Sequence, residues 1–359
     1  MYLVYSCGSN GNGQLGLEHE NDVATPEIAF QSSLPLKSIS CGGNHTALLM
    51  ENGDVYQTGL VNGRKTHKFE LTHKDISGVV AGWDCTLKIT RTGAVYNNDD
   101  TKIWQGPSDV KFTIANLDSF IVGYDSGQAV CSGNNKKGQL LGDDVGGKTV
   151  EGFQELTFNE LPFSNVTLVK CCLGRDFSLF VLSDGTSQYL AMRGKSDRYG
   201  LLEKLQTMVG SGALRGELGV NKTRWFKIAP DVTVVALKSM WSSVHLQYTR
   251  GNETRFCSVG NNVYRQLLQR AEHVWDFQVG TEHGVTVSEN RKEAHAWGWG
   301  EHGNCGVHGI DNCGELTLLY TCAADETIQQ VYAGYASTWI VVYKDCLLYT
   351  SDAADDMQC

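Results

Sequence analysis

The chain of 359 residues lacks the features of several protein classes. It contains no apolar run of 18 residues, so we expect no membrane-spanning helix. Its first residues do not combine a basic segment with an apolar one, so we expect no signal peptide. Its 12 cysteines include no Cys-x-x-Cys pair and are scattered among apolar runs. Reduced core thiols of this kind predict a cytoplasmic location, with the nucleus as the alternative.

Clustered positive charge is also missing. The chain has 30 Lys and Arg against 40 Asp and Glu, a formal net charge of −10, and it has no basic tail. Because phosphate binding needs clustered cations that displace counterions, we expect no nucleic-acid partner. A basic or metal-bearing protein partner fits this charge better.

The chain does contain a Gly-rich loop that recurs. The pattern Gly-x-Asn-x-x-Gly-Gln-Leu-Gly at residues 8–16 returns in variant form at residues 132–140, 260–267 and 298–306. Such self-similarity indicates stacked supersecondary units.

A second element, a small-residue turn followed by a short apolar run, lies between these loops. It begins seven times, at Gly42, Gly82, Asn116, Gly174, Ser242, Gly280 and Gly334. Short apolar runs bounded by Gly, Asn and Asp predict strands joined by tight turns. Only residues 197–208 suggest a helix, and their pattern is ambiguous.

Seven such units over residues 1–345 have the length of four-stranded propeller blades. A blade cannot bury both of its faces alone, so the units must pack radially into a ring. The seventh unit lacks a Gly-rich loop of its own, whereas the chain begins with a strand at residues 2–6 and that loop. We therefore predict an all-β, seven-bladed β-propeller, closed by the N-terminal strand completing the last blade.

Residues 346–359 have no place in a blade. Their sequence is similar to the translation of a sequencing-library adapter joined in frame, so we expect a non-native, disordered tail. Without the three Asp of this tail, the formal net charge of −10 becomes −7.

The recurring loop, with Asp22 and Pro26 downstream, resembles the regulator-of-chromosome-condensation repeat family. Residues 297–306, which repeat the loop most fully, bring the chain closer to one small yeast member of that family. This closer resemblance implies a non-enzymatic propeller that binds a small zinc electron-donor protein of the diphthamide and Elongator pathways. The implied role is to modulate diphthamide synthesis and Elongator-dependent tRNA wobble modification, with indirect effects on microtubules. Outside such a complex we expect a monomer.

The founding member of the family implies an alternative, guanine-nucleotide exchange on a small GTPase. Exchange would need a protruding wedge, which the insert-like segments 143–162 or 195–230 could supply. A ubiquitin-ligase or kinase adaptor is a third and weaker interpretation, because such propellers are usually attached to a second domain.

Two patterns resemble reactive sites, and we interpret both as coincidence. Residues 142–149 match the phosphate-binding pattern Gly-x4-Gly-Lys-Thr, but that loop works between a buried strand and a helix, and no helical pattern follows here. His302, Cys305 and His308 offer at most three loosely spaced zinc ligands. We therefore predict no metal site, no cofactor and no catalytic residue.

The seven small-residue turns should converge around the central channel, because the turns on one rim of a propeller point the same way. Aromatic residues beside acids at loop tips are typical of interface anchors. The alternative for His45, His283 and Asp84 is hydrogen bonding between blades. We predict partner-binding residues at Trp83, Asp84, Glu282, His283, Trp299, Glu301, His302 and Tyr335.

Overall fold

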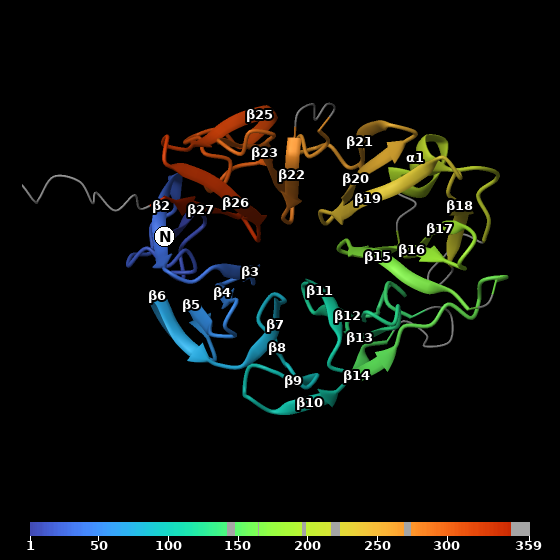
Figure 1. The fold of residues 1–359 in the computed structure, drawn as a ribbon, viewed down its shortest axis with the longest axis horizontal. Helices are drawn as coiled ribbons and strands as arrows, with labels where there is room; N and C mark the ends of the chain where they lie inside the picture. The colour runs from blue at the N-terminus through green and yellow to red at the C-terminus, as the bar shows by residue number, and fades with distance from the viewer. Residues whose placement is uncertain (142–147, 164, 196–198, 217–222, 269–273, 346–359) are drawn as a thin grey trace, which may run out of the picture.

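The chain folds into a closed ring of seven β-sheets, which Figure 1 shows along the shortest axis of the molecule. This computed structural model describes residues 1–141, 148–163, 165–195, 199–216, 223–268 and 274–345. The first strand of each blade lies nearest the centre of the ring. The prediction of a seven-bladed, almost entirely β propeller is confirmed.

The first four blades have four antiparallel strands each. Blade 1 contains β3 (Leu36–Cys41), β4 (His45–Met50), β5 (Val55–Val61) and β6 (Arg64–His73). Blade 2 contains β7 (Ile76–Ala81), β8 (Thr86–Thr90), β9 (Ala94–Tyr96) and β10 (Lys102–Gln105). Blade 3 contains β11 (Val110–Asn116), β12 (Ser119–Tyr124), β13 (Ala129–Gly133) and β14 (Val150–Glu155). Blade 4 contains β15 (Thr167–Leu173), β16 (Phe177–Ser183), β17 (Gln188–Gly194) and β18 (Arg224–Lys227).

The next two blades differ in size. Among the described residues, blade 5 has three strands, β19 (Val232–Ser239), β20 (Ser243–Arg250) and β21 (Glu253–Gly260). Blade 6 again has four, β22 (Val274–Val279), β23 (His283–Ser288), β24 (Glu293–Trp299) and β25 (Asn312–Thr321).

Blade 7 closes the ring with strands from distant parts of the chain. β26 (Glu326–Ala333) pairs with β27 (Ser337–Lys344), and β27 pairs with β1 (Tyr2–Gly8) in the register Val4↔Val341. β2 (Val23–Ser32) then pairs with β1 on the outer side. The N-terminal strand therefore completes the last blade as predicted, but β2 joins it, so this end of the chain contributes two strands.

The predicted turns fall at equivalent places in all seven blades. Residues 42–44 follow β3, residues 280–282 follow β22, and the other five turns likewise connect the first strand of a blade to the second. The sequence repeat therefore marks the inner hairpin of each blade.

The described parts of the two inserts pack into the ring. The first insert supplies β14, and its Leu156, Phe158 and Leu161 are buried against blades 3 and 4. Strand β14, not a helix, follows the phosphate-loop pattern, whose residues 142–147 lie outside the described residues. The described part of this insert therefore forms blade structure and not the wedge considered for nucleotide exchange.

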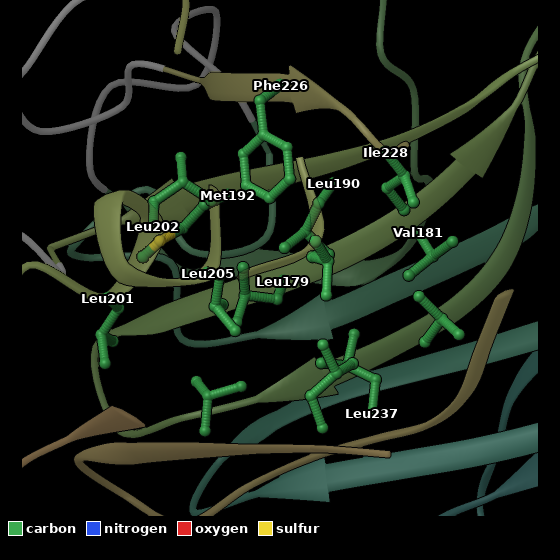
Figure 2. Packing of buried hydrophobic residues seen from close by; sticks show 14 of the residues in the cluster. Leu179, Val181, Leu190, Met192, Leu201, Leu202, Leu205, Phe226, Ile228 and Leu237 are labelled. Carbon is green, nitrogen blue, oxygen red and sulfur yellow. The ribbon is translucent and has the colours of Figure 1, made fainter. Parts of the chain in front are cut away.

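The second insert contains the helix α1 (Leu201–Val209) and the strand β18. Figure 2 shows Leu201, Leu202 and Leu205 of α1 directed into the apolar core around β16, β17 and β18. This core continues into β19 and β20, so it joins blade 4 to blade 5. Within the ambiguous helical pattern at residues 197–208, the described structure thus has the short helix α1, which buries one face. No helix in the described ranges has the length and apolarity needed to cross a membrane, and the predicted tail at residues 346–359 lies outside those ranges.

Candidate functional site

An open cavity of about 740 Å³ lies on one rim of the ring. In each blade, the turn after the first strand and the loop after the third strand reach the same rim, because neighbouring strands run antiparallel. Both kinds of segment line the cavity. Six of the eight predicted residues line it: Trp83, Glu282, Trp299, Glu301, His302 and Tyr335.

The recurring Asn and Gln of the Gly-rich loop bind the backbone of that loop. Asn10 Oδ1 accepts a hydrogen bond from the Leu15 N–H at 2.9 Å, and Gln14 Oε1 accepts one from the Asn12 N–H at 2.8 Å. The loops after β13 and β21 repeat both bonds through Asn135, Gln139, Asn262 and Gln266. Because these Asn and Gln side chains fix the loop backbone, the residues between these anchors are available to line the cavity.

The first Gly of the loop is required by close contact with the neighbouring turn. Gly298 has a φ of +96°, and a Cβ atom there would lie 2.5 Å from the Glu282 carbonyl oxygen. The next residue, Trp299, donates its N–H to the same oxygen at 2.9 Å. Gly133 shows the same approach to the carbonyl of Asp118. The glycine therefore allows loop and turn to meet at the rim.

Backbone hydrogen bonds also join the turns of neighbouring blades. The Trp83 N–H of blade 2 donates to the Leu117 carbonyl of blade 3 at 2.6 Å. The Trp241 N–H of blade 5 donates to the Thr281 carbonyl of blade 6 at 2.8 Å. These bonds give each turn a fixed position relative to the next, so the cavity side chains are held by the scaffold.

Tyr335 reaches across the axis of the ring. It belongs to blade 7, yet its hydroxyl oxygen accepts a hydrogen bond of 2.7 Å from the Leu117 N–H of blade 3. Its ring makes edge contacts with Trp83 and Trp241 at centroid distances of 5.2 and 6.1 Å. Burial raises the pKa of the Tyr335 phenol to about 12. Trp83, Trp241 and Tyr335 thus form a central aromatic cluster that stays neutral near pH 7.

A second aromatic group stands on the Gly-rich loop of blade 6. Trp299 contacts Tyr264 and His302, with ring centroids 6.4 and 5.3 Å away. The Trp299 indole N–H donates to Glu301 Oε2 at 3.2 Å. His302 Nδ1 lies 2.6 Å from Asp22 Oδ2, which links this loop to the corresponding loop of blade 7.

Tyr264 is a cavity residue that the sequence reasoning missed. Its side chain is 40% exposed and lines the cavity beside Trp299. It stands between Asn262 and Gln266, which bind the loop backbone, and this position in the repeat is the signal that could have found it.

Glu282 is a half-buried acid in the cavity. Its carboxylate accepts hydrogen bonds from Gln266 Nε2 at 2.7 Å and from Ser242 Oγ at 3.2 Å. Burial raises the pKa of Glu282, and these two donors and the charge of Arg175 act in the opposite direction. The Arg175 guanidinium lies over Trp241, with Cζ 5.5 Å from the ring centroid.

His283 and His45 lie next to cavity residues but point into the ring. His283 is 0% exposed, and its Nε2 lies 2.9 Å from Thr338 Oγ1 of blade 7. His45 Nε2 lies 2.6 Å from Thr86 Oγ1 of blade 2. Burial lowers the pKa of both imidazoles to about 4. Both histidines therefore join blades, the alternative considered above, and His283 is removed from the binding surface because solvent does not reach it.

Two other residues complete the contrast between surface and interior. Asp84 is exposed but lies outside the cavity lining, and its carbonyl accepts a hydrogen bond from Asn98 Nδ2 within blade 2. Trp297 is 0% exposed, and its indole N–H donates to the Gln266 carbonyl at 2.8 Å. We use the name buried layer for His45, His283 and Trp297, and cavity layer for Trp83, Glu282 and Trp299.

Two of the three residues weighed as zinc ligands have other partners. His302 pairs with Asp22, and Cys305 is buried with its Sγ 3.4 Å from the Trp299 carbonyl oxygen. Within the described ranges, no group of three or more His, Cys, Asp or Glu side chains is arranged to hold a metal ion.

Comparisons with known proteins agree with this architecture. Residues 3–49 and 36–63 match models of the Regulator of chromosome condensation (RCC1) repeat. An RCC1 repeat-containing protein of Schizosaccharomyces pombe is 23% identical over 95% of this chain and 99% of its own length. The secretion-regulating guanine nucleotide exchange factor of Mus musculus is 32% identical, but over only 26% of this chain and 23% of its own length.

Solved structures show the same fold. Prp20p of Saccharomyces cerevisiae, described with its binding properties to Gsp1p and histones, superposes with a TM-score of 0.74 at 16% identity, over 96% of this chain and 92% of its own. Human WBSCR16 superposes with a TM-score of 0.72 at 14% identity, over 96% and 99% of the two chains. The matched repeats cover residues 3–63, one relative aligns over nearly the full length of the chain, and the solved structures share its propeller fold.

Proposed function

We propose that this chain is a protein-binding propeller whose partner docks on the cavity rim. The observation that carries this proposal is the rim itself, where Trp83 and Tyr264 are 39% and 40% exposed beside an open cavity that also contains acids. Aromatic anchors in a recess with a polar border are typical of interface hot spots. Because hydrogen bonds between blades hold the turns, little ordering would be required on binding.

A small GTPase is the partner class that the relatives favour, with nucleotide exchange as the result of binding. The secretion-regulating relative is named as a guanine nucleotide exchange factor, and Prp20p was studied for its binding to Gsp1p. The described parts of both inserts are packed into blades, so among the described residues we place the segment that opens the nucleotide site on the cavity rim.

A small zinc electron-donor protein is the second candidate. It is supported by residues 297–306, which carry the closer resemblance to the yeast alpha-tubulin suppressor and which place Trp299, Glu301 and His302 on the cavity. The implied role is modulation of diphthamide synthesis and Elongator-dependent tRNA modification. Acidic groups of such a partner would meet Arg175 and Lys195 on the same rim.

Site-specific photocrosslinking tests the docking face. The crosslinking residue p-benzoylphenylalanine replaces Tyr264 on the cavity rim or, as the control, Trp275. Trp275 is 44% exposed and lies at the start of β22, whose other end leads into the Thr281 turn, so it belongs to the opposite rim. We expect a specific adduct from position 264 and none from position 275. Adducts of equal yield from both positions would contradict docking on the cavity rim.

The identity of the adduct then separates the two partner classes. If it is a small GTPase, the wild-type protein should accelerate release of a fluorescent GDP analogue from that GTPase. The Trp83→Ala/Trp299→Ala double variant should lose this acceleration, because it lacks both rim anchors. An adduct with the zinc protein, together with unchanged GDP release, would select the second candidate.

A further inference from the structure

The cavity contains an acid, Glu282, whose carboxylate accepts hydrogen bonds from the chain but has no ion-pair partner among the described residues. Glu282 is held by Gln266 and Ser242, which are neutral donors, and a carboxylate can accept about four hydrogen bonds. Within the described part of the chain, no Lys or Arg forms an ion pair with it, and Arg175 acts on it only from longer range. A half-buried carboxylate in this state gains from an incoming cation.

Aromatic side chains line the same cavity as this acid. Trp299 leaves the backbone beside Glu282, because its N–H donates to the Glu282 carbonyl at 2.9 Å. Its indole N–H is occupied by Glu301, and its side chain lines the cavity. Tyr264 lies 6.4 Å from Trp299, between ring centroids. A cation over such faces is attracted by the ring quadrupole.

The chain itself shows that the cavity accommodates a guanidinium. The Arg175 guanidinium lies 5.5 Å from the Trp241 ring centroid. Arg175 and Lys195, the cavity's basic residues, are exposed, whereas Glu282 is half-buried. The more deeply placed charge is therefore negative.

We propose that the cavity receives one Lys or Arg side chain of the docked protein, with its charge at Glu282 and its methylene groups against Trp299 and Tyr264. This inference rests on the proposed function, since it names the group that a partner presents on the cavity rim. It commits to a basic anchor residue, whatever the overall charge of the partner.

The experiment uses side-chain analogues as probes and the indole N–H signals of the 15N-labelled protein as the readout. The probes are n-butylammonium and ethylguanidinium, with n-butanol as the uncharged comparison. We expect saturable shifts of the Trp299 and Trp241 signals with the two cations and much weaker binding of n-butanol. The stronger cation identifies the preferred anchor as Lys or Arg. Equal binding of n-butanol would overturn the proposal.

Variants assign the charge recognition to one residue. Glu282→Gln should weaken cation binding at least tenfold, while Asp84→Asn, which removes an exposed acid outside the cavity, should change it less than twofold. The Gln side chain keeps an acceptor for Gln266 and Ser242, and an unchanged thermal midpoint verifies the fold. If Glu282→Gln does not fold, the cations are titrated into Trp299→Ala and the Trp241 indole signal is followed. A cation affinity equal to that of the wild-type protein would then overturn the proposal.

The two proposals fail in different ways. Crosslinking from position 264 that persists at full yield in Glu282→Gln, with no cation binding in the wild-type protein, would remove the basic anchor and keep the docking face. If the protein whose only change is the crosslinking residue at position 264 forms no specific adduct, the proposed docking face is wrong.

Discussion

The buried layer and the cavity layer lie close together in the sequence, but their side chains have different surroundings. Glu282 lines the cavity, whereas its neighbour His283 is fully buried and bonds to Thr338 of the next blade. On β24 the same contrast separates Trp299, which lines the cavity, from Trp297, which solvent does not reach. One or two positions along the chain thus decide whether a side chain holds the ring or faces a partner.

This difference separates stability from binding. Substitutions in the buried layer should lower the free energy of unfolding, since they remove packing and hydrogen bonds between blades. Substitutions in the cavity layer should lower partner affinity and leave the fold intact, because these side chains line an open cavity and not the interior of the ring. The comparison is wrong if cavity-layer substitutions lower the free energy of unfolding, or if buried-layer substitutions lower partner affinity in a protein that remains folded.

The largest effect on stability is expected for Trp297→Ala. Truncating this buried indole should lower the free energy of unfolding by about 3–5 kcal/mol, because it leaves a cavity and removes the bond to the Gln266 carbonyl. Urea denaturation measures this loss. Trp297→Phe, which keeps most of the packing, should lose less. A loss below about 1 kcal/mol for Trp297→Ala would break the assignment of Trp297 to the buried layer.

Acid should weaken the buried layer through its histidines. The pKa of His283 is lowered to about 4 in the folded chain, against about 6.5 when unfolded, so below pH 6.5 the unfolded state binds the proton first. The stabilisation by neutral His283 is complete above pH 6.5 and is lost as the pH falls toward 4. Between pH 7.5 and pH 5, this group should cost about 2 kcal/mol in the free energy of unfolding.

The matched variant for this acid effect is His283→Gln, which keeps a polar group near Thr338 but cannot be protonated. Its unfolding free energy should fall less between pH 7.5 and pH 5 than that of the wild-type chain. The pKa of His45 is also lowered to about 4 by burial, so His45 makes the same contribution to the pH dependence of both proteins. An identical pH dependence of the two proteins would show that His283 does not carry the acid sensitivity.

Tyr335→Phe should have a smaller effect and tests a cavity residue whose hydroxyl also joins two blades. The substitution leaves the Leu117 N–H without its acceptor, which should cost about 1 kcal/mol of unfolding free energy. The aromatic contacts with Trp83 and Trp241 remain, so partner affinity should change less than about threefold. Thermal unfolding measures the change in stability, and titration with the partner identified by crosslinking measures the change in affinity. A large loss of affinity with no loss of stability would mean that the hydroxyl itself contacts the partner.

The smallest effect is expected for Asp84→Asn. Asp84 is exposed and lies outside the cavity lining, so unfolding free energy should change by less than about 0.5 kcal/mol. Partner affinity should also stay close to that of the wild-type chain in the same titration. A clear loss of affinity would extend the binding surface beyond the cavity.

Much of the fold could be predicted because the repeat marks the inner hairpin of every blade. The count of turns and the closure through β1 follow from that repeat, since strand β1 is apolar enough to recognise. Strand β2 was missed because only Val23 and Ala24 of its ten residues are buried at this outer position, so no apolar run is visible. Helix α1 was ambiguous because its buried face is short.

The sequence predicted on which rim of the propeller the site lies, but it did not predict every side chain that lines the site. The orientation of neighbours in a turn depends on its backbone angles, so Glu282 and His283 looked equivalent in the sequence. Tyr264 was missed because its role depends on the hydrogen bonds of Asn262 and Gln266, which hold the loop around it. The repeat therefore predicts where the surface lies, and the geometry of each turn decides which side chain reaches it.

The most direct test of the separation between layers is the partner dissociation constant of the Trp83→Ala/Trp299→Ala double variant, measured beside its thermal midpoint. The predicted result is an affinity about 30-fold or more below that of the wild-type chain, with a midpoint within about 3 °C. A double variant that binds the partner as the wild-type chain does, or that loses binding only together with its fold, would contradict the account.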